Sequence, residues 1–130
     1  MLEPHQESAT EVTRVDQDKI NKFSTLLNVR VDLEDRLRSR KELLKLYEDA
    51  SDEIMLMDED TVQQAIGDVF LISSKESAEK RVEKTATNLR EEIEKIEEDL
   101  LNTRSEMMSI KSSLYAKFGE SINLEDDYSK

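Results

Sequence analysis

The segment that determines the architecture of the chain is residues 61–73, which read Thr-Val-Gln-Gln-Ala-Ile-Gly-Asp-Val-Phe-Leu-Ile-Ser. A Gly67-Asp68 pair between two five-residue runs is typical of a β-hairpin with a type I′ or II′ turn. Four consecutive apolar residues make both faces of the second strand apolar, and an isolated hairpin with open edges is marginal in water. We therefore expect neighbouring chains to cover it by completing a sheet or barrel, the alternative being a hairpin packed on its own helices. The expected assembly residues are Val62, Ile66, Gly67, Val69, Phe70, Leu71 and Ile72.

Heptad patterns extend from this hairpin in both directions. Pro4 is the only proline, and Gly67 and Gly119 are the only glycines, so little interrupts a helix on either side. We expect helices over about residues 14–57 and 75–118. Seven of ten seam positions in the first are apolar: Phe23, Leu26, Arg30, Leu33, Leu37, Arg40, Leu44, Tyr47, Ser51 and Ile54. Nine of ten are apolar in the second: Val82, Ala86, Leu89, Ile93, Ile96, Leu100, Thr103, Met107, Ile110 and Leu114.

The two seams are arranged symmetrically about the hairpin turn. A chain reversal at the junction of Ile66 and Gly67 pairs Phe23 with Ile110, Leu26 with Met107, Leu33 with Leu100, Leu37 with Ile96 and Leu44 with Leu89. Arg30 then faces Thr103, a polar layer of the kind that can fix register. The fold class is therefore mainly α, a long antiparallel two-helix coiled coil joined by one β-hairpin that contributes to an intersubunit β-barrel.

Local signals mark the helix ends and the exposed faces. Thr13 followed by Asp16 resembles a capping box, Ser74 is a candidate N-cap, and Gly119 suits a left-handed C-terminal residue. Pairs spaced four residues apart are expected to form ion pairs on the exposed faces. They are Asp32 with Arg36, Glu34 with Arg38, Glu76 with Lys80 and Glu91 with Lys95.

Apolar residues are in excess at the helix ends far from the hairpin. Two facing helices are not expected to bury all of them, and surplus apolar surface commonly marks a binding site. The alternative for Ile122 and Leu124 is a local cap over the helix ends. The candidate binding residues are Val15, Ile20, Phe23, Leu27, Tyr115, Phe118, Ile122 and Leu124.

Composition excludes several classes of function. The 130 residues include 31 acids and 19 bases, and a net charge of −12 disfavours nucleic acid and anionic membranes as partners. The absence of cysteine excludes disulfides and fits a reducing compartment, so we expect a cytoplasmic protein. His5 is the only histidine, and the acidic run Asp58-Glu59-Asp60 lacks the glycine and distal glutamate of a calcium loop. We expect no catalytic site, no metal and no cofactor.

Motifs at the two helix ends and in the hairpin resemble a known family. They are Val15-Asp16-Gln17-Asp18-Lys19-Ile20-Asn21-Lys22-Phe23-Ser24, Ile66-Gly67-Asp68-Val69-Phe70, Leu114-Tyr115-Ala116-Lys117-Phe118-Gly119 and Ile122-Asn123-Leu124-Glu125. Together they are similar to prefoldin, specifically to its β-type subunits, over about residues 12–125. Residues 1–12 and 126–130 are then expected to be flexible tails flanking a single prefoldin-like domain over residues 13–125.

The resemblance to prefoldin implies a function that the residue pattern alone does not give. It implies a cytosolic heterohexamer of two α-type and four β-type subunits, whose hairpins form a double β-barrel. It also implies ATP-independent capture of unfolded clients, such as actin and tubulin, at the coiled-coil tips and their transfer to the cytosolic chaperonin. A structural tether without client binding is the alternative, and an apolar tip is the feature that argues against it.

Overall fold

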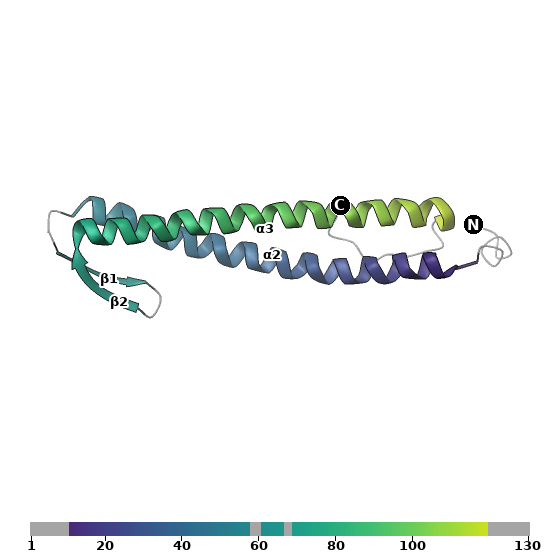
Figure 1. Cartoon of the computed structure of the whole chain (residues 1–130), viewed down its shortest axis with the longest axis horizontal. Helices are drawn as coiled ribbons and strands as arrows, with labels where there is room; N and C mark the ends of the chain where they lie inside the picture. The colour runs from purple at the N-terminus through teal and green to yellow at the C-terminus, as the bar shows by residue number, and fades with distance from the viewer. Residues whose placement is uncertain (1–10, 58–60, 67–68, 120–130) are drawn as a thin grey trace. The chain divides into compact units, whose positions relative to one another are not determined.

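Two long helices and two short strands make up the secondary structure of the described residues (Figure 1). The computed structural model describes residues 11–57, 61–66 and 69–119, with side chains for residues 11–57 and 74–119. In chain order the elements are α2 (Arg14–Met55), β1 (Thr61–Ile66), β2 (Val69–Ser74) and α3 (Lys75–Phe118). Both helices start where the sequence predicts, and α2 ends at Met55 rather than at residue 57.

The predicted caps are present at three helix ends. The amide of Asp16 donates to the hydroxyl of Thr13 at 3.1 Å, and the amide of Thr13 donates to the carboxylate of Asp16 at 3.0 Å, so the capping box is reciprocal. The Ser77 amide donates to the Ser74 hydroxyl at 3.2 Å, which caps α3. Gly119 has φ +60°, the left-handed conformation that ends α3.

The end of α2 is held by a side chain from the start of α3. The amide of Met57 donates to the carbonyl of Ile54 at 3.1 Å, a tightened last turn that leaves later carbonyls without helical partners. The ammonium of Lys75 donates to the carbonyl of Met57 at 2.6 Å and to that of Met55 at 3.4 Å. The α2 last turn contains no basic residue of its own, so Lys75 supplies the positive charge that a helix C-terminus favours.

Strands β1 and β2 pair antiparallel over six residues each. Their register runs from Thr61 opposite Ser74 to Ile66 opposite Val69, and it places Phe70 opposite Ala65. In the described part of the chain the sheet contains these two strands alone. Gly67 and Asp68 lie outside the described residues, so the turn type stays a prediction.

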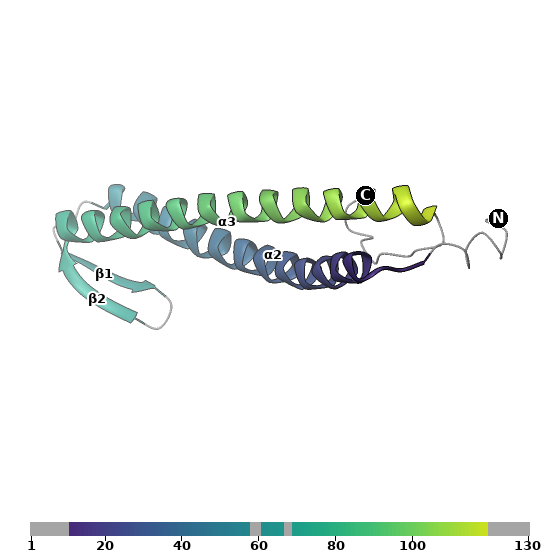
Figure 2. The same ribbon diagram turned by 45° about the vertical axis from the view of Figure 1, so that its right-hand side comes forward.

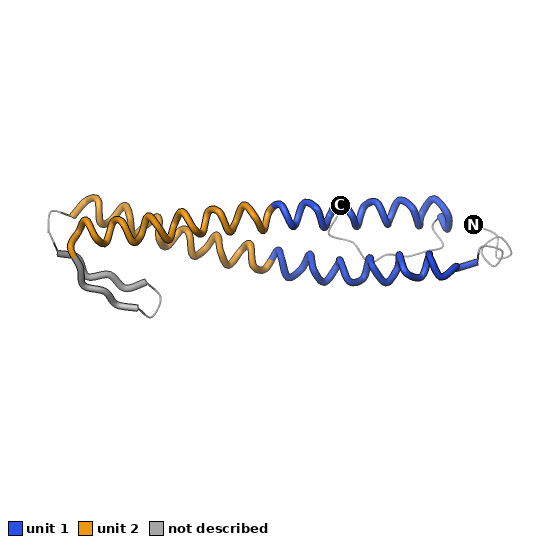
Figure 3. The backbone as a smooth tube through the Cα atoms, in the orientation of Figure 1, with its two compact units in different colours: residues 1–34, 98–130 blue, residues 35–97 orange. Residues whose placement is uncertain are grey.

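The chain divides into two compact units (Figure 3). Unit 1 comprises residues 1–34 and 98–130, and unit 2 comprises residues 35–97. Within each unit, α3 runs beside α2 in the opposite direction, as both ribbon views show (Figures 1 and 2). Ion pairs between the helices agree with this antiparallel arrangement. Lys22 binds Glu106 in unit 1, and Arg40 binds Glu92 in unit 2.

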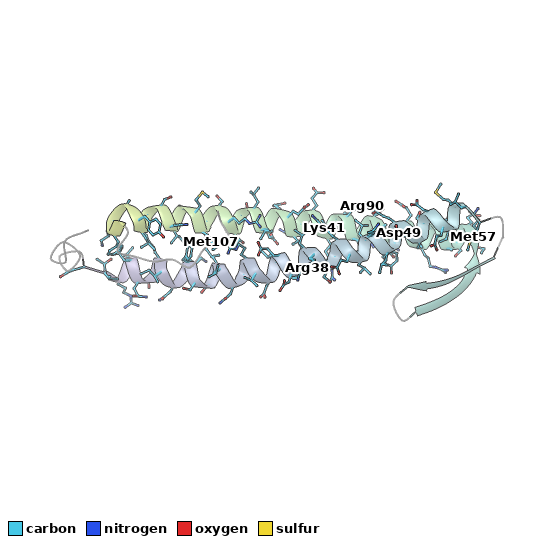
Figure 4. The ribbon with its side chains drawn as sticks, turned by 180° about the vertical axis from the view of Figure 1, so that it is seen from behind. Arg38, Lys41, Asp49, Met57, Arg90 and Met107 are labelled. Carbon is cyan, nitrogen blue, oxygen red and sulfur yellow. The ribbon has the colours of Figure 1, made fainter. Side chains whose placement is uncertain are left out.

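The heptad seams form the core of each unit, as predicted. In unit 1, Phe23, Leu26, Met107, Leu114 and Phe118 form one buried cluster, and the side chain of Met107 lies between the helices (Figure 4). In unit 2, Ile54, Ala78 and Val82 form a second cluster, with Tyr47, Ala50 and Met57 packed against it. Each of the twenty predicted seam positions is buried or half-buried.

The expected polar layer lies inside unit 1. Arg30 is 1% exposed and Thr103 is 8% exposed. The Thr103 hydroxyl donates to the carbonyl of Asp99 at 2.8 Å, so its polar group is satisfied within α3.

Candidate functional site

The candidate site lies at the end of unit 1 where α2 begins and α3 ends. Asp16 in the first turn of α2 accepts a hydrogen bond from the ammonium of Lys117 in the last turn of α3. These two residues belong to the two end motifs, 101 positions apart in sequence. The motif at the start of α2 and the motif at the end of α3 are therefore joined in one structural feature.

The carboxylate of Asp16 is almost fully buried and is held in its charged form. Its exposed fraction is 5%, and it also accepts from the amide of Thr13. The Lys117 ammonium, followed by the Thr13 amide, lowers the pKa of Asp16 from 3.8 to about 2. A neighbouring polar link supports the same end, because the Lys19 ammonium donates to the Ser113 hydroxyl at 2.7 Å.

Four of the predicted tip residues form or line the core of this end. Phe23 is 2% exposed and Phe118 is 6% exposed, and Ile20 and Leu27 pack against their cluster. The expected apolar surplus is therefore smaller than the sequence suggests, because these side chains are covered in the folded unit. A direct role of Phe23 or Phe118 in client binding stays a prediction, and their visible role is to hold the helix ends together.

Two predicted tip residues are exposed. Val15 is 62% exposed and Tyr115 is 36% exposed. The Lys111 ammonium lies over the Tyr115 ring at 5.7 Å from its centroid, and the Lys117 ammonium lies 5.2 Å from that of Phe118. Ile122 and Leu124 lie outside the described residues.

The seam and end motifs did not point to the other exposed apolar residues of α3. Leu101 is 67% exposed and Met108 is 61% exposed, and both lie on the same helix face as Tyr115 because seven residues separate each from the next. The seven-residue spacing of Leu101, Met108 and Tyr115 was available in the sequence. This spacing is easy to overlook because each of the three residues directly follows a seam residue, so that all three look like part of the seam.

The second predicted site is the hairpin, whose position in the chain agrees with β1 and β2. Val62, Ile66, Val69, Phe70, Leu71 and Ile72 lie in these strands, and Gly67 lies outside the described residues. Because the described sheet has only two strands, each strand has one edge that no described strand covers. The assembly role of these residues stays a prediction.

The described ranges contain neither a metal-binding cluster nor a helix suited to a membrane. No group of three or more His, Asp or Glu side chains among these residues is arranged to hold a metal ion. Neither α2 nor α3, over the residues described, contains a stretch that is long and apolar enough for a membrane span.

Comparison with known proteins supports a single family. Residues 17–121 match the profile of the family described as prefoldin subunit. Prefoldin subunit 4 of Homo sapiens is 40% identical over 120 residues, which cover 91% of this chain and 90% of that protein. Prefoldin subunit 4 of Saccharomyces cerevisiae is 37% identical over 126 residues, which cover 96% and 98%. A probable prefoldin subunit 4 of Dictyostelium discoideum is 36% identical over 118 residues, covering 90% and 89%. The chain therefore belongs to the prefoldin family of chaperone-complex subunits, and among them it resembles subunit 4.

Proposed function

We propose that this chain is a β-type subunit of a cytoplasmic heterohexamer with two α-type and four β-type subunits. In this proposal the complex captures unfolded polypeptides, such as actin and tubulin, and delivers them to the cytosolic chaperonin. Neither ATP nor a metal takes part. Family membership supports the assembly with other prefoldin subunits.

Two parts of the chain have separate roles in the proposed function. The β1–β2 hairpin joins the strands of neighbouring subunits in an intersubunit β-barrel, because its outer edges and apolar sequence favour further pairing. The end of unit 1 contacts the client. Each contact is weak, and several subunits together give the complex its affinity.

One observation carries the client-binding part of the proposal. Val15 and Tyr115 remain exposed at an end where the capping box, the ion pair of Asp16 with Lys117 and the Phe23 cluster fix both helices. Exposed apolar side chains on a rigid support are suited to binding, because little ordering entropy is lost on contact. A tether has no need of such a surface.

The test uses reassembled complex containing a full-length variant of this subunit. Val15→Ser with Tyr115→Ser should reduce the suppression of aggregation of a chemically denatured client while the hexamer still forms. The loss should be partial, because the other subunits still bind. The matched control is Leu46→Ser with Met55→Ser, which removes two apolar side chains of unit 2 that are 57% and 66% exposed. Equal protection by both variants and by wild type would favour the tether.

A further inference from the structure

Unit 1 carries an exposed apolar stripe that neither seam nor capping explains. It consists of Leu101, Met108 and Tyr115, which lie on one face of α3. Three large apolar side chains in a row are unusual on a helix that is polar elsewhere on its surface. The exposure of these three side chains therefore calls for a functional explanation. The neighbouring residues indicate on which side of the helix pair the stripe lies.

An ion pair identifies the flank of the seam on which the stripe lies. Arg104 follows Leu101 by three residues and precedes Met108 by four, so it borders the stripe, and it binds Glu34 of α2 at 2.9 Å. The same flank continues in seven-residue steps from Glu34 to Leu27 and Ile20. Along α3 the same flank continues in seven-residue steps from Arg104 to Lys111 and Phe118. Ile20 and Leu27 both pack against the cluster that contains Phe118, as this register requires.

The result is one continuous surface, which we call the lateral face. It comprises the stripe Leu101, Met108 and Tyr115, together with Ile20, Leu27 and Lys111. The opposite flank of the seam carries the pair of Lys22 with Glu106 and the hydrogen bond from Lys19 to Ser113, and the exposed Val15 and Val29 lie seven residues on either side of Lys22. The lateral face combines three exposed apolar side chains with a cation, Lys111, whose ammonium lies over the Tyr115 ring.

Charge at the helix ends is opposite to that of the whole chain. Residues 14–31 and 101–118 contain seven cations and three acids, although the chain has a net charge of −12. The cations are Arg14, Lys19, Lys22, Arg30, Arg104, Lys111 and Lys117, and the acids are Asp16, Asp18 and Glu106. Lys22, Arg104 and Lys117 already bind acids, and Arg30 is 1% exposed. Lys111 on the lateral face favours a partner with carboxylates, and the stripe favours one with apolar side chains.

The spacing of the stripe defines the partner further. Seven helical residues span about 10 Å at a rise of 1.5 Å each. An unfolded chain in the polyproline II conformation advances about 9 Å in three residues and brings every third side chain to the same side. Successive stripe residues therefore match every third residue of an extended unfolded chain.

We propose that the lateral face binds unfolded segments in which apolar residues recur at every third position and carboxylates stand between them. This inference rests on the proposed client-binding function and names the chemistry of the client. Leu101, Met108 and Tyr115 contact the apolar residues. Lys111, held over the Tyr115 ring, pairs with a carboxylate.

The test measures binding of fluorescent peptides to reassembled wild-type complex by anisotropy. Three peptides of equal length are used, namely a Leu-Glu-Ser repeat, a Leu-Lys-Ser repeat and a scrambled form of the first with its leucines clustered. The Leu-Glu-Ser peptide should bind most tightly. The ratio of its affinity to that of the Leu-Lys-Ser peptide should fall at high salt. Lys111→Glu should weaken the Leu-Glu-Ser peptide by roughly twofold to fivefold and strengthen the Leu-Lys-Ser peptide. The matched control is Lys84→Glu, which makes the same change at an exposed position of α3 in unit 2.

A second variant separates the apolar contact from the charge. Leu101→Ser with Met108→Ser should weaken both repeat peptides, and it should leave the fold intact because both side chains are largely exposed. Equal binding of all three peptides by wild type, with no effect of Lys111→Glu, would overturn the inference. The proposed function survives that result if the complex still protects a denatured client, and it fails if such protection is absent as well. If deletion of residues 120–130 strengthens binding and removes the effect of Lys111→Glu, the occupant is the chain's own C-terminal segment and the inference is wrong.

Discussion

The ammonium of Lys117 binds the carboxylate of Asp16, and this pair joins the last turn of α3 to the first turn of α2. Asp16 also closes the capping box with Thr13, so one carboxylate serves both the start of a helix and the contact between two helices. The end of unit 1 should therefore depend on the charge of this single side chain.

The first prediction concerns the pH dependence of this end. The pKa of Asp16 is about 2 in the folded chain and 3.8 ordinarily, so its stabilising effect is complete above pH 3.8. It should be lost as the pH falls from there through about 2, because the carboxylate then takes up a proton. Thermal unfolding of wild type and Asp16→Asn, followed by circular dichroism along a pH series, measures the difference in stability between the two proteins. The difference between the two proteins should shrink below pH 3.8, and a difference that is constant across this range would contradict the assignment.

The second prediction concerns Phe23, which the sequence placed both in the seam and among the candidate binding residues, and which is buried in the core of unit 1. Phe23→Ala should destabilise unit 1 by roughly 3 to 5 kcal/mol, the cost of emptying a buried aromatic site. Hydrogen exchange in reassembled complex should accelerate over residues 14–34 and 98–118 and stay unchanged over residues 35–55. Leu46→Ala, at a side chain that is 57% exposed, serves as the control and should change little. Normal exchange in the Phe23 variant would mean that the cluster does not hold the helix ends.

The third prediction concerns Lys75, which donates to two carbonyls at the end of α2. Lys75→Met keeps most of the apolar stem and removes the charge, and it should weaken the last turn by about 1 kcal/mol. The measurement is hydrogen exchange at the amides of Leu56 and Met57, which should become faster. Lys80→Met is the matched control, because it makes the same change at a lysine that binds Glu76 within α3. Equal exchange in both variants would show that Lys75 does not hold this end.

The seams and caps could be predicted because they depend on residues close in sequence. A spacing of three and four places side chains on one helix face whatever the partner, and each predicted seam position is covered. The ion pairs were harder to predict. Glu76 binds Lys80 as expected, but Arg38 binds Asp35 rather than Glu34, and Glu34 binds Arg104 across the helices. Long charged side chains choose among several partners of similar energy, so spacing along one helix does not determine the pair.

The candidate site was predictable in its location and less so in its detail. The two end motifs pointed to residues that the fold brings together through Asp16 and Lys117. Which apolar residues outside the seam stay exposed depends on how closely the two helices approach, and the sequence does not give that distance. Phe23 is a seam position and is covered as the seam predicts. Phe118 lies beyond Leu114, the last predicted seam position, and is covered as well, whereas Leu101 and Met108, each one residue outside the seam, are exposed.

The last prediction concerns assembly through the hairpin. Phe70→Asp should prevent incorporation into the hexamer, because the proposed barrel would bury an unpaired charge at that position. Helix content should change little, since α2 and α3 have cores of their own in each unit. The measurement is sizing by mass after coexpression with partner subunits, together with circular dichroism. Phe70→Leu keeps an apolar side chain and should incorporate normally. Incorporation of Phe70→Asp at the wild-type level would show that β2 is not an assembly strand, and the open edges of the hairpin would then need another explanation.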